Sequence, residues 1–447
     1  MTRAALSMMA LGLVAAGGRA QSAFTGDAAS KSGSARAGDV ATSSELVASA
    51  GTTADAAPTL QPPGLAGPFP FGVWLQDPVQ VINGKSVAQH YKEMGITDWM
   101  GMYLWPSEAH RYPGYNLHAA QALQANGFKV YAGEDLAAVA WNQANPQYAA
   151  TFVGYVVGDE PDMTKAFVPA HHPVTFRANC QLMRQSDPGR ILWSNFGKGF
   201  AKIPWPGYQA FPGPTIQDDH NKYTDFIDVA SVSFYGITDP WEMPFYVGLW
   251  TYGKAIDNCR YYVDHNPANP GLPVWGFIES GNSFTANTGL YLTMPTELIR
   301  PAVWNMIVHG ANGITYFAHH LYPGGINPTY PINVPAVGRA IRNTNLSITA
   351  FGAVLTTRTV PGTTVTTNST VTVTALTKEF GGDTYIFAMG NGDTTHQYGQ
   401  SLTATISLVT KGTTVEVIGE SRELTIVDSS FTDDFGPYQL HIYRITQ

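Results

Sequence analysis

Residues 152–163 read FVGYVVGDEPDM and join an apolar run to three carboxylates. Aromatic and β-branched residues fill 152–158, which predicts a buried β-strand. Asp159, Glu160 and Asp162 come where that strand ends, beside Pro161, which is expected to prevent an immediate helix. Two interpretations are open: a polar loop that happens to be acidic, or a loop that carries a catalytic acid.

The strand at 152–158 is one of eight short apolar segments that alternate with helical segments between residues 68 and 345. This alternation predicts an α/β fold, a (β/α)8 barrel, for which about 250 residues are typical. A doubly wound open sheet is the alternative, but no Gly-rich dinucleotide fingerprint follows the first strand. The predicted strands are 69–75, 98–105, 129–134, 152–158, 190–195, 229–236, 273–279 and 313–319.

The pattern changes after about residue 345. Helical spacing disappears, and threonine and valine alternate in segments such as GTTVTTNSTVTVTALT at 362–377. Short alternating strands with turn signals between them predict an antiparallel β-sandwich at 346–447. We expect this second domain to pack against the barrel and stabilise it.

The composition excludes one class of function. Charged residues make up only 13% of the chain, about half of the usual share of roughly 25%. The net charge is −8 and no Lys/Arg cluster stands out, so the surface of a nucleic-acid-binding protein is not expected. The sequence leaves the oligomeric state open.

The first residues have the pattern of a secretory signal peptide. Arg3 precedes an apolar run that ends at about Ala16, and Gly18-Arg19-Ala20 fits a cleavage signal. Because the run is shorter than the about 20 residues that span a bilayer, we expect residues 1–20 to be removed and the protein to be secreted or periplasmic, without membrane contact. Residues 21–67 are rich in Ala, Ser, Thr and Gly, which predicts a disordered linker.

Cys180 and Cys259 are the only cysteines. They could form a disulfide in an oxidising compartment, but they fall in predicted helices that flank different strands. Two unbonded thiols are an equal alternative.

Two glutamates stand out at the carboxyl ends of the predicted strands, where a (β/α)8 barrel builds its active site. Glu160 follows the fourth strand and Glu279 ends the seventh. A retaining glycosidase needs one carboxylic acid to protonate the leaving oxygen and one carboxylate to attack the anomeric carbon, about 5 to 5.5 Å apart. A strand-end glutamate can instead cap a helix or form a salt bridge. Pro161 and the strand-four position argue against this for Glu160, and isolation in an apolar strand argues against it for Glu279.

These features resemble the clan of retaining glycoside hydrolases with a (β/α)8 barrel that includes β-galactosidases, cellulases, mannanases and β-glucuronidases. In that clan the acid/base glutamate ends strand four, usually as Asn-Glu-Pro, and the nucleophile glutamate ends strand seven. The resemblance implies these roles for Glu160 in VVGDEPD and Glu279 in VWGFIES. Residues 300–317 also look like the last helix and strand of bacterial β-galactosidases of the clan, and 430–445 look like the closing strands of its small β-sandwich.

The chain departs from the clan at two positions. Asp159 stands where the clan has an asparagine that contacts the sugar 2-hydroxyl. An aspartate cannot donate a hydrogen bond there, and its charge is expected to raise the pKa of Glu160, which suits a general acid. Strand eight offers Phe317 and His319 where the clan commonly has a tryptophan.

Other strand-end residues are candidates for binding a sugar. Tyr235 is placed to hydrogen-bond the nucleophile and keep it ionised, and tryptophans near the upper loops could stack on pyranose rings. Trp74 and Trp141 are two such stacking candidates. The predicted substrate-binding residues are Asp77, Trp105, Glu134, Asp135, Asp159, Asn195, Tyr235, Trp241 and His319.

Two histidine pairs, 171–172 and 319–320, invite a metal interpretation. A barrel metallohydrolase takes ligands from several strand ends, commonly a His-x-His on the first strand, and the segment WLQDP at 74–78 has none. We therefore expect neither a metal nor a cofactor.

Together these patterns predict a secreted, two-domain retaining glycoside hydrolase that acts on a carbohydrate. Long aromatic loops at 197–225 and 280–293 favour a cleft for a polysaccharide or oligosaccharide. A transglycosylase that uses the same glutamates and a non-catalytic carbohydrate-binding barrel are the alternatives.

Overall fold

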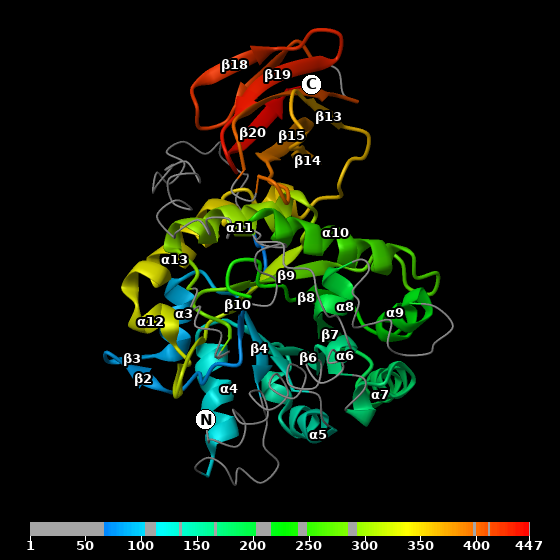
Figure 1. The fold of residues 1–447 in the computed structure, drawn as a ribbon. Coiled ribbons are helices and arrows are strands. Elements are labelled where there is room, and N and C mark those ends of the chain that lie inside the picture. The colour runs from blue at the N-terminus through cyan, green and yellow to red at the C-terminus, as the bar shows by residue number, and fades with distance from the viewer. Residues whose placement is uncertain are drawn as a thin grey trace, which may run out of the picture.

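A computed structural model describes most of the chain from residue 67 onward (Figure 1). The predicted signal peptide at 1–20 and the predicted linker up to residue 66 lie outside the described residues. Among the helices described, none is long and apolar enough to cross a membrane. The described ranges are 67–102, 113–133, 136–164, 168–202, 216–239, 248–284, 293–396, 399–409 and 412–446.

Eight parallel strands close into a barrel, which confirms the (β/α)8 prediction and excludes the open sheet. Each of the eight lies within one of the segments predicted as strands or extends it by a single residue. Around the barrel the order is β1-β10-β9-β8-β7-β6-β5-β4. The strands are β1 (Phe71–Trp74), β4 (Asp98–Met102), β5 (Lys129–Ala132), β6 (Phe152–Asp159), β7 (Ile191–Phe196), β8 (Val229–Val232), β9 (Val274–Glu279) and β10 (Gly313–Phe317).

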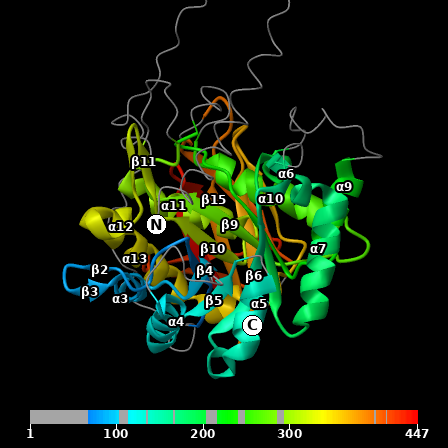
Figure 2. The same ribbon diagram turned by 90° about the horizontal axis from the view of Figure 1, so that it is seen from below.

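Helices surround these strands on the outside of the barrel (Figure 2). The first begins with a capping box, in which Ser86 Oγ accepts the N–H of Gln89 and Gln89 Oε1 accepts the N–H of Ser86. The main helices are α3 (Val87–Glu93), α4 (Tyr115–Ala125), α5 (Leu136–Ala144), α7 (Pro173–Ser186), α9 (Ile216–Thr224), α10 (Trp250–Asp264), α11 (Thr296–Val308) and α13 (Pro335–Thr349).

Short elements lie in the connections between strands and helices. The short helix α8 and the longer helix α9 both fall in the 197–225 segment that was predicted as a loop. The short helices are α6 (Pro161–Thr164), α8 (Lys198–Ala201), α12 (Tyr330–Asn333), α14 (Gly352–Leu355), η1 (Pro146–Tyr148) and η2 (Pro169–His171), and the two small hairpins are β2 (Val81–Ile82) with β3 (Lys85–Ser86) and β11 (His320–Tyr322) with β12 (Gly325–Asn327).

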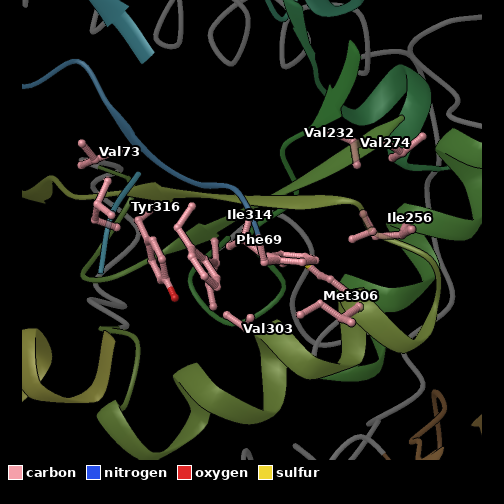
Figure 3. Packing of buried hydrophobic residues seen from close by; sticks show 14 of the residues in the cluster. Phe69, Val73, Val232, Ile256, Val274, Val303, Met306, Ile314 and Tyr316 are labelled. Atoms are coloured by element: carbon pink, nitrogen blue, oxygen red, sulfur yellow. The ribbon is translucent and has the colours of Figure 1, made fainter. Parts of the chain in front are cut away.

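The barrel has two apolar layers. Large aromatic side chains fill its interior, with Trp74 packing against Trp193 and Phe277 at ring distances of 5.9 and 5.4 Å. A second layer lies between the strands and the outer helices, where Ile314 of β10 faces Val303 of α11 (Figure 3). Close packing of these layers fixes where each strand ends and therefore where its last side chain lies.

The C-terminal region is a β-sandwich, as predicted, with a three-stranded sheet (β13-β16-β19) and a five-stranded sheet (β14-β15-β20-β17-β18). Its strands are antiparallel in every pair. The predicted domain boundary at residue 345 lies within α13. The strands are β13 (Thr364–Thr367), β14 (Val373–Phe380), β15 (Asp383–Gly390), β16 (Leu402–Ser407), β17 (Thr414–Val417), β18 (Arg422–Thr425), β19 (Ser430–Phe435) and β20 (Leu440–Ile445).

The sandwich packs on the barrel beside α10 and α11 (Figure 1). Trp304 of α11 stacks on Phe387 of β15 at 5.9 Å, and both are almost completely buried. Asn305 next to it donates a hydrogen bond of 2.9 Å to Asn391 of the sandwich. The expectation that the sandwich packs against the barrel is confirmed.

The structure answers two local expectations, one about Pro161 and one about the two cysteines. The prediction that Pro161 prevents a helix is wrong, because α6 begins at Pro161 itself. Proline is favoured at a first helical position, where its missing N–H is not needed. Cys180 and Cys259 are both buried, and no disulfide joins them.

Candidate active site

The predicted strand-end glutamates lie at the same rim of the barrel. Glu160 comes directly after β6 and Glu279 is the last residue of β9, the fourth and seventh barrel strands in chain order. Since all eight strands are parallel, both side chains are at the carboxyl end of the barrel, where such folds build active sites.

The backbone before Glu160 is distorted. The register between β6 and β7 shifts between Val156 and Asp159, which indicates a bulge there. Gly158 has φ +139°, and a Cβ on it would lie 2.8 Å from the ring of Phe176. Glu160 itself has φ +49°, a left-handed conformation that is costly for a residue with a side chain and that concentrates at functional sites.

Glu160 is held by hydrogen bonds to residues from two neighbouring strand ends. Ser233, after β8, donates a hydrogen bond of 2.6 Å to Glu160 Oε1, and the Glu160 N–H donates to the carbonyl of Asn195 at 2.8 Å. Burial and the negative charge of Asp159 raise the pKa of Glu160 to about 7, although Ser233 and Lys198 act in the opposite direction. A proton is therefore available on this group near neutral pH.

Glu279 is completely buried. Two hydroxyl groups donate to the same oxygen, Oε1: that of Tyr252 at 2.7 Å and that of Thr238 at 3.2 Å. The other oxygen, Oε2, has no hydrogen-bond partner among the described residues. Burial raises the pKa of Glu279 to about 7, while the two hydroxyl donors lower it. The described residues therefore leave one carboxylate oxygen, itself buried, without a donor.

The segment 233–239, which follows β8, contacts both carboxyl groups. Ser233 bonds Glu160, and Thr238 bonds Glu279. Between them Tyr235 lies close enough to both glutamates for each negative charge to raise its pKa, after the larger effect of burial. The two carboxyl groups thus face a common region around Tyr235.

Tyr235 does not make the hydrogen bond that was expected of it. The bond to Glu279 comes from Tyr252 of α10 instead. The ring of Tyr235 packs against Phe317 and Phe284 at 5.6 and 5.9 Å. It stays a candidate for contact with substrate.

Three other predicted residues are fixed by hydrogen bonds at the rim. Asn195 Nδ2 donates to Asp159 Oδ1 at 2.9 Å, and Asp159 is exposed. Asp77 accepts from the hydroxyl of Tyr115 at 3.0 Å. These residues stay candidates for contact with sugar hydroxyl groups.

His319 is buried beside strand one. Its Nε2 lies 3.4 Å from Nε2 of Gln76, and its ring is 4.9 Å from that of Phe317. Phe317 of β10 is the strand partner of Glu279 of β9. Burial lowers the pKa of His319 to about 4, so the ring is neutral at pH 7. His319 therefore adds no charge to the site.

The tryptophans expected to stack on sugar rings have different outcomes. Trp74 is the last residue of β1, but its ring packs inside the barrel and is 3% exposed, which argues against its assignment as a stacking residue. Trp141 packs against Tyr148 and Phe152 of its own unit. Four predicted substrate-binding residues, Trp105, Glu134, Asp135 and Trp241, lie outside the described residues.

Several residues of the site were missed by sequence reasoning. Ser233 lies inside the segment 229–236 predicted as strand six, but β8 ends at Val232, and Thr238 lies two residues past the predicted end. A strand-end rule applied a few residues to either side of the predicted end would have found both. Lys198, which forms a 2.7 Å ion pair with Asp239 beside Glu160, follows strand five in the same way. Tyr252 carries no such signal, because it lies on a helix. In the described part of the chain no three His, Cys, Asp or Glu side chains converge as metal ligands would.

Comparisons with known proteins give structural likeness only. No family model matches the chain, and no curated protein does. A family 39 glycoside hydrolase from the gut symbiont Bacteroides cellulosilyticus WH2 is similar, with a TM-score of 0.46 and 12% identity, over 85% of this chain and 81% of that one. An alpha-L-arabinofuranosidase from Thermotoga maritima has a TM-score of 0.46 and 11% identity, over 85% and 96%. A GH30 endoxylanase from Clostridium papyrosolvens C71 has a TM-score of 0.41 and 13% identity, over 86% and 98%. Likeness at this level carries no statement about activity, so the site itself has to indicate the function.

Proposed function

We propose that this protein is a glycoside hydrolase that retains the configuration of the anomeric carbon. The observation that carries the proposal is the pair of glutamates at the rim of the barrel. Glu279 is fully buried and keeps one oxygen without a partner among the described residues, and Glu160 has a pKa near 7. Double displacement requires two groups, a nucleophile and a general acid, and both are proposed here at the same rim of the barrel.

In the first step Glu279 Oε2 attacks the anomeric carbon, and the bond from this carbon to the leaving oxygen breaks. Glu160 transfers its proton to that oxygen, so a glycosyl ester on Glu279 and a free alcohol result. In the second step Glu160, now a carboxylate, takes a proton from water. The water oxygen attacks the anomeric carbon, and Glu279 leaves as a carboxylate.

The hydrogen bonds favour the required protonation states. Burial raises the pKa of each glutamate to about 7. Glu279 receives two hydroxyl donors, which stabilise its ionised form, whereas Glu160 receives one from Ser233 and lies beside the negative Asp159. We therefore assign the carboxylate to Glu279 and the proton to Glu160 in the resting site.

The substrate proposed is a polysaccharide or oligosaccharide. Polar rim residues are the candidates for its hydroxyl groups: Asp77, Asp159, Asn195, Tyr235 and His319, with Glu134 and Asp135 from the sequence alone. Trp105 and Trp241 are proposed to stack on sugar rings. Such a substrate agrees with export from the cytoplasm through the signal peptide proposed at 1–20.

The test is chemical rescue. The Glu160→Gln and Glu279→Ala variants are assayed with aryl glycosides and a panel of glycans, with and without azide, and Glu423→Gln, an exposed glutamate of β18, is the control. Azide is expected to rescue Glu160→Gln with a retained glycosyl azide and Glu279→Ala with an inverted one. Unchanged turnover in both variants would remove the proposal.

A further inference from the structure

A chain of hydrogen bonds joins Asp159 to Glu160 through two side chains from neighbouring strand ends. Asn195 Nδ2 donates to Asp159 Oδ1 at 2.9 Å and lies 3.5 Å from Ser233 Oγ. Ser233 Oγ donates to Glu160 Oε1 at 2.6 Å. Asn195 and Ser233, the two middle members of the chain, are 2% and 4% exposed, whereas Asp159 at its end is exposed.

The chemistry of the groups fixes the direction of the chain. The Asn195 amide nitrogen only donates, so Ser233 Oγ is the acceptor in their contact. A serine hydroxyl has a single proton, and Ser233 uses it to donate the hydrogen bond of 2.6 Å to the carboxyl group of Glu160. The alternative acceptor, the carbonyl of Phe196, is 3.3 Å away and already accepts the Ser233 N–H at 2.8 Å. Glu160 Oε1 is thus held as an acceptor.

We propose that Asn195 and Ser233 are positioning residues that reserve Oε1 of Glu160 as a hydrogen-bond acceptor and place the transferable proton on Oε2. This inference rests on the proposed function. In the first step the Oε2–H bond breaks, the proton goes to the leaving oxygen and the electron pair stays on the carboxylate. In the second step Oε2 takes a proton from water. Ser233 donates to Oε1 in both steps, so the reacting oxygen stays the same.

Asp159 gains a role in this arrangement. Its carboxylate accepts one N–H of Asn195 and orients the amide so that the second N–H meets Ser233. The titratable or charged groups that face Glu160 from the surrounding elements are Asp159, Asp162, Lys198, Tyr235 and Asp239.

The strand that precedes Ser233 supplies a matched control. Ser231 lies two residues before Ser233 and is also buried, but its hydroxyl has no hydrogen-bond partner among the described residues. Removing either hydroxyl makes the same change of volume. Only the removal of Ser233 Oγ takes a donor from Glu160, so a purely structural role predicts the same result for both variants.

The experiment measures the pKa of Glu160 without any substrate. The full chain is labelled with glutamate carrying ¹³C at the carboxyl carbon, and the Glu160 signal is identified by its loss in Glu160→Gln. Ser233→Ala is expected to raise this pKa by about one unit, because a donor to the charged form is lost, and Ser231→Ala is expected to leave it unchanged. Ser233→Cys, which keeps a weak donor, is expected to lie between.

Kinetics supply the second readout. In Ser233→Ala the alkaline limb of the pH profile should move up with the pKa. Turnover of glycosides with poor leaving groups should fall about tenfold, while activated aryl glycosides, which need little acid catalysis, should change less. Equal NMR titrations in Ser233→Ala and Ser231→Ala would overturn the positioning role. A shifted pKa together with full activity in Glu160→Gln would uphold the hydrogen-bond chain and reject the proposed function.

Discussion

Replacing Glu279 by glutamine should stabilise the folded protein relative to wild type, and this gain in the free energy of unfolding should be larger at alkaline than at acidic pH. Burial raises the pKa of this carboxyl from 4.5 to about 7. Because the folded pKa lies above the unfolded one, the folded protein holds the extra proton between these values. The contribution of Glu279 to stability is therefore fully present below about pH 4.5 and is lost as the pH rises through 7.

The size of the effect follows from the shift. One pKa unit corresponds to about 1.4 kcal/mol, so the raised pKa of Glu279 lowers the free energy of unfolding by about 3 kcal/mol at pH 8 and by about 1 kcal/mol at pH 5. Glutamine does not ionise, and its Oε1 can still accept from Tyr252 and Thr238. The variant should gain about 2 kcal/mol over wild type between pH 5 and pH 8.

Urea unfolding at both pH values, followed by tryptophan fluorescence, measures this difference. Glu423→Gln, which removes an exposed carboxyl, is the control and should show no comparable gain. If the stability difference between Glu279→Gln and wild type is the same at pH 5 and pH 8, the pKa of Glu279 is not raised in the folded protein. The conclusion that burial raises this pKa would then be wrong.

Three further predictions concern single contacts. Tyr252→Phe removes a 2.7 Å donor from Glu279, so the pKa of Glu279 should rise and the acidic limb of the pH–activity profile should move up by about one unit. Asp159→Asn removes a negative charge beside Glu160, so the pKa of Glu160 should fall and the alkaline limb should move down, again by about one unit. Phe387→Ala empties a buried position between the sandwich and the barrel and should lower the free energy of unfolding by about 3 to 5 kcal/mol.

Two of these variants, Tyr252→Phe and Phe387→Ala, have a control in the chain. Tyr261→Phe changes an exposed tyrosine of the same helix as Tyr252 and should leave the profile unmoved. A limb that moves in the opposite direction in Tyr252→Phe or Asp159→Asn would contradict the electrostatic reasoning. Val427→Ala, at a 62% exposed position, should change stability by less than about 1 kcal/mol. A loss in Phe387→Ala no larger than this would mean that the interface contributes little.

The sequence by itself determined the order of elements and the ends of the strands. The alternation of apolar strands and amphipathic helices is a local pattern. A closed parallel barrel is one of the few folds that bury the strands together with the apolar faces of the helices. Because the strands are parallel, a residue that ends a strand is at the active rim wherever it comes in the chain. For this reason the order of the strands is enough to predict that Glu160 and Glu279 share one rim, and the structure confirms that placement.

Tertiary structure decided which side chains touch these glutamates. Tyr252 reaches Glu279 from α10, and Ser233 reaches Glu160 across 73 positions of sequence, because helix packing and barrel closure set those distances. Neither contact has a local pattern in sequence. The burial of Trp74 inside the barrel likewise depends on which face of β1 turns inward, and a strand so short and apolar on both faces leaves that choice to the packing of its neighbours.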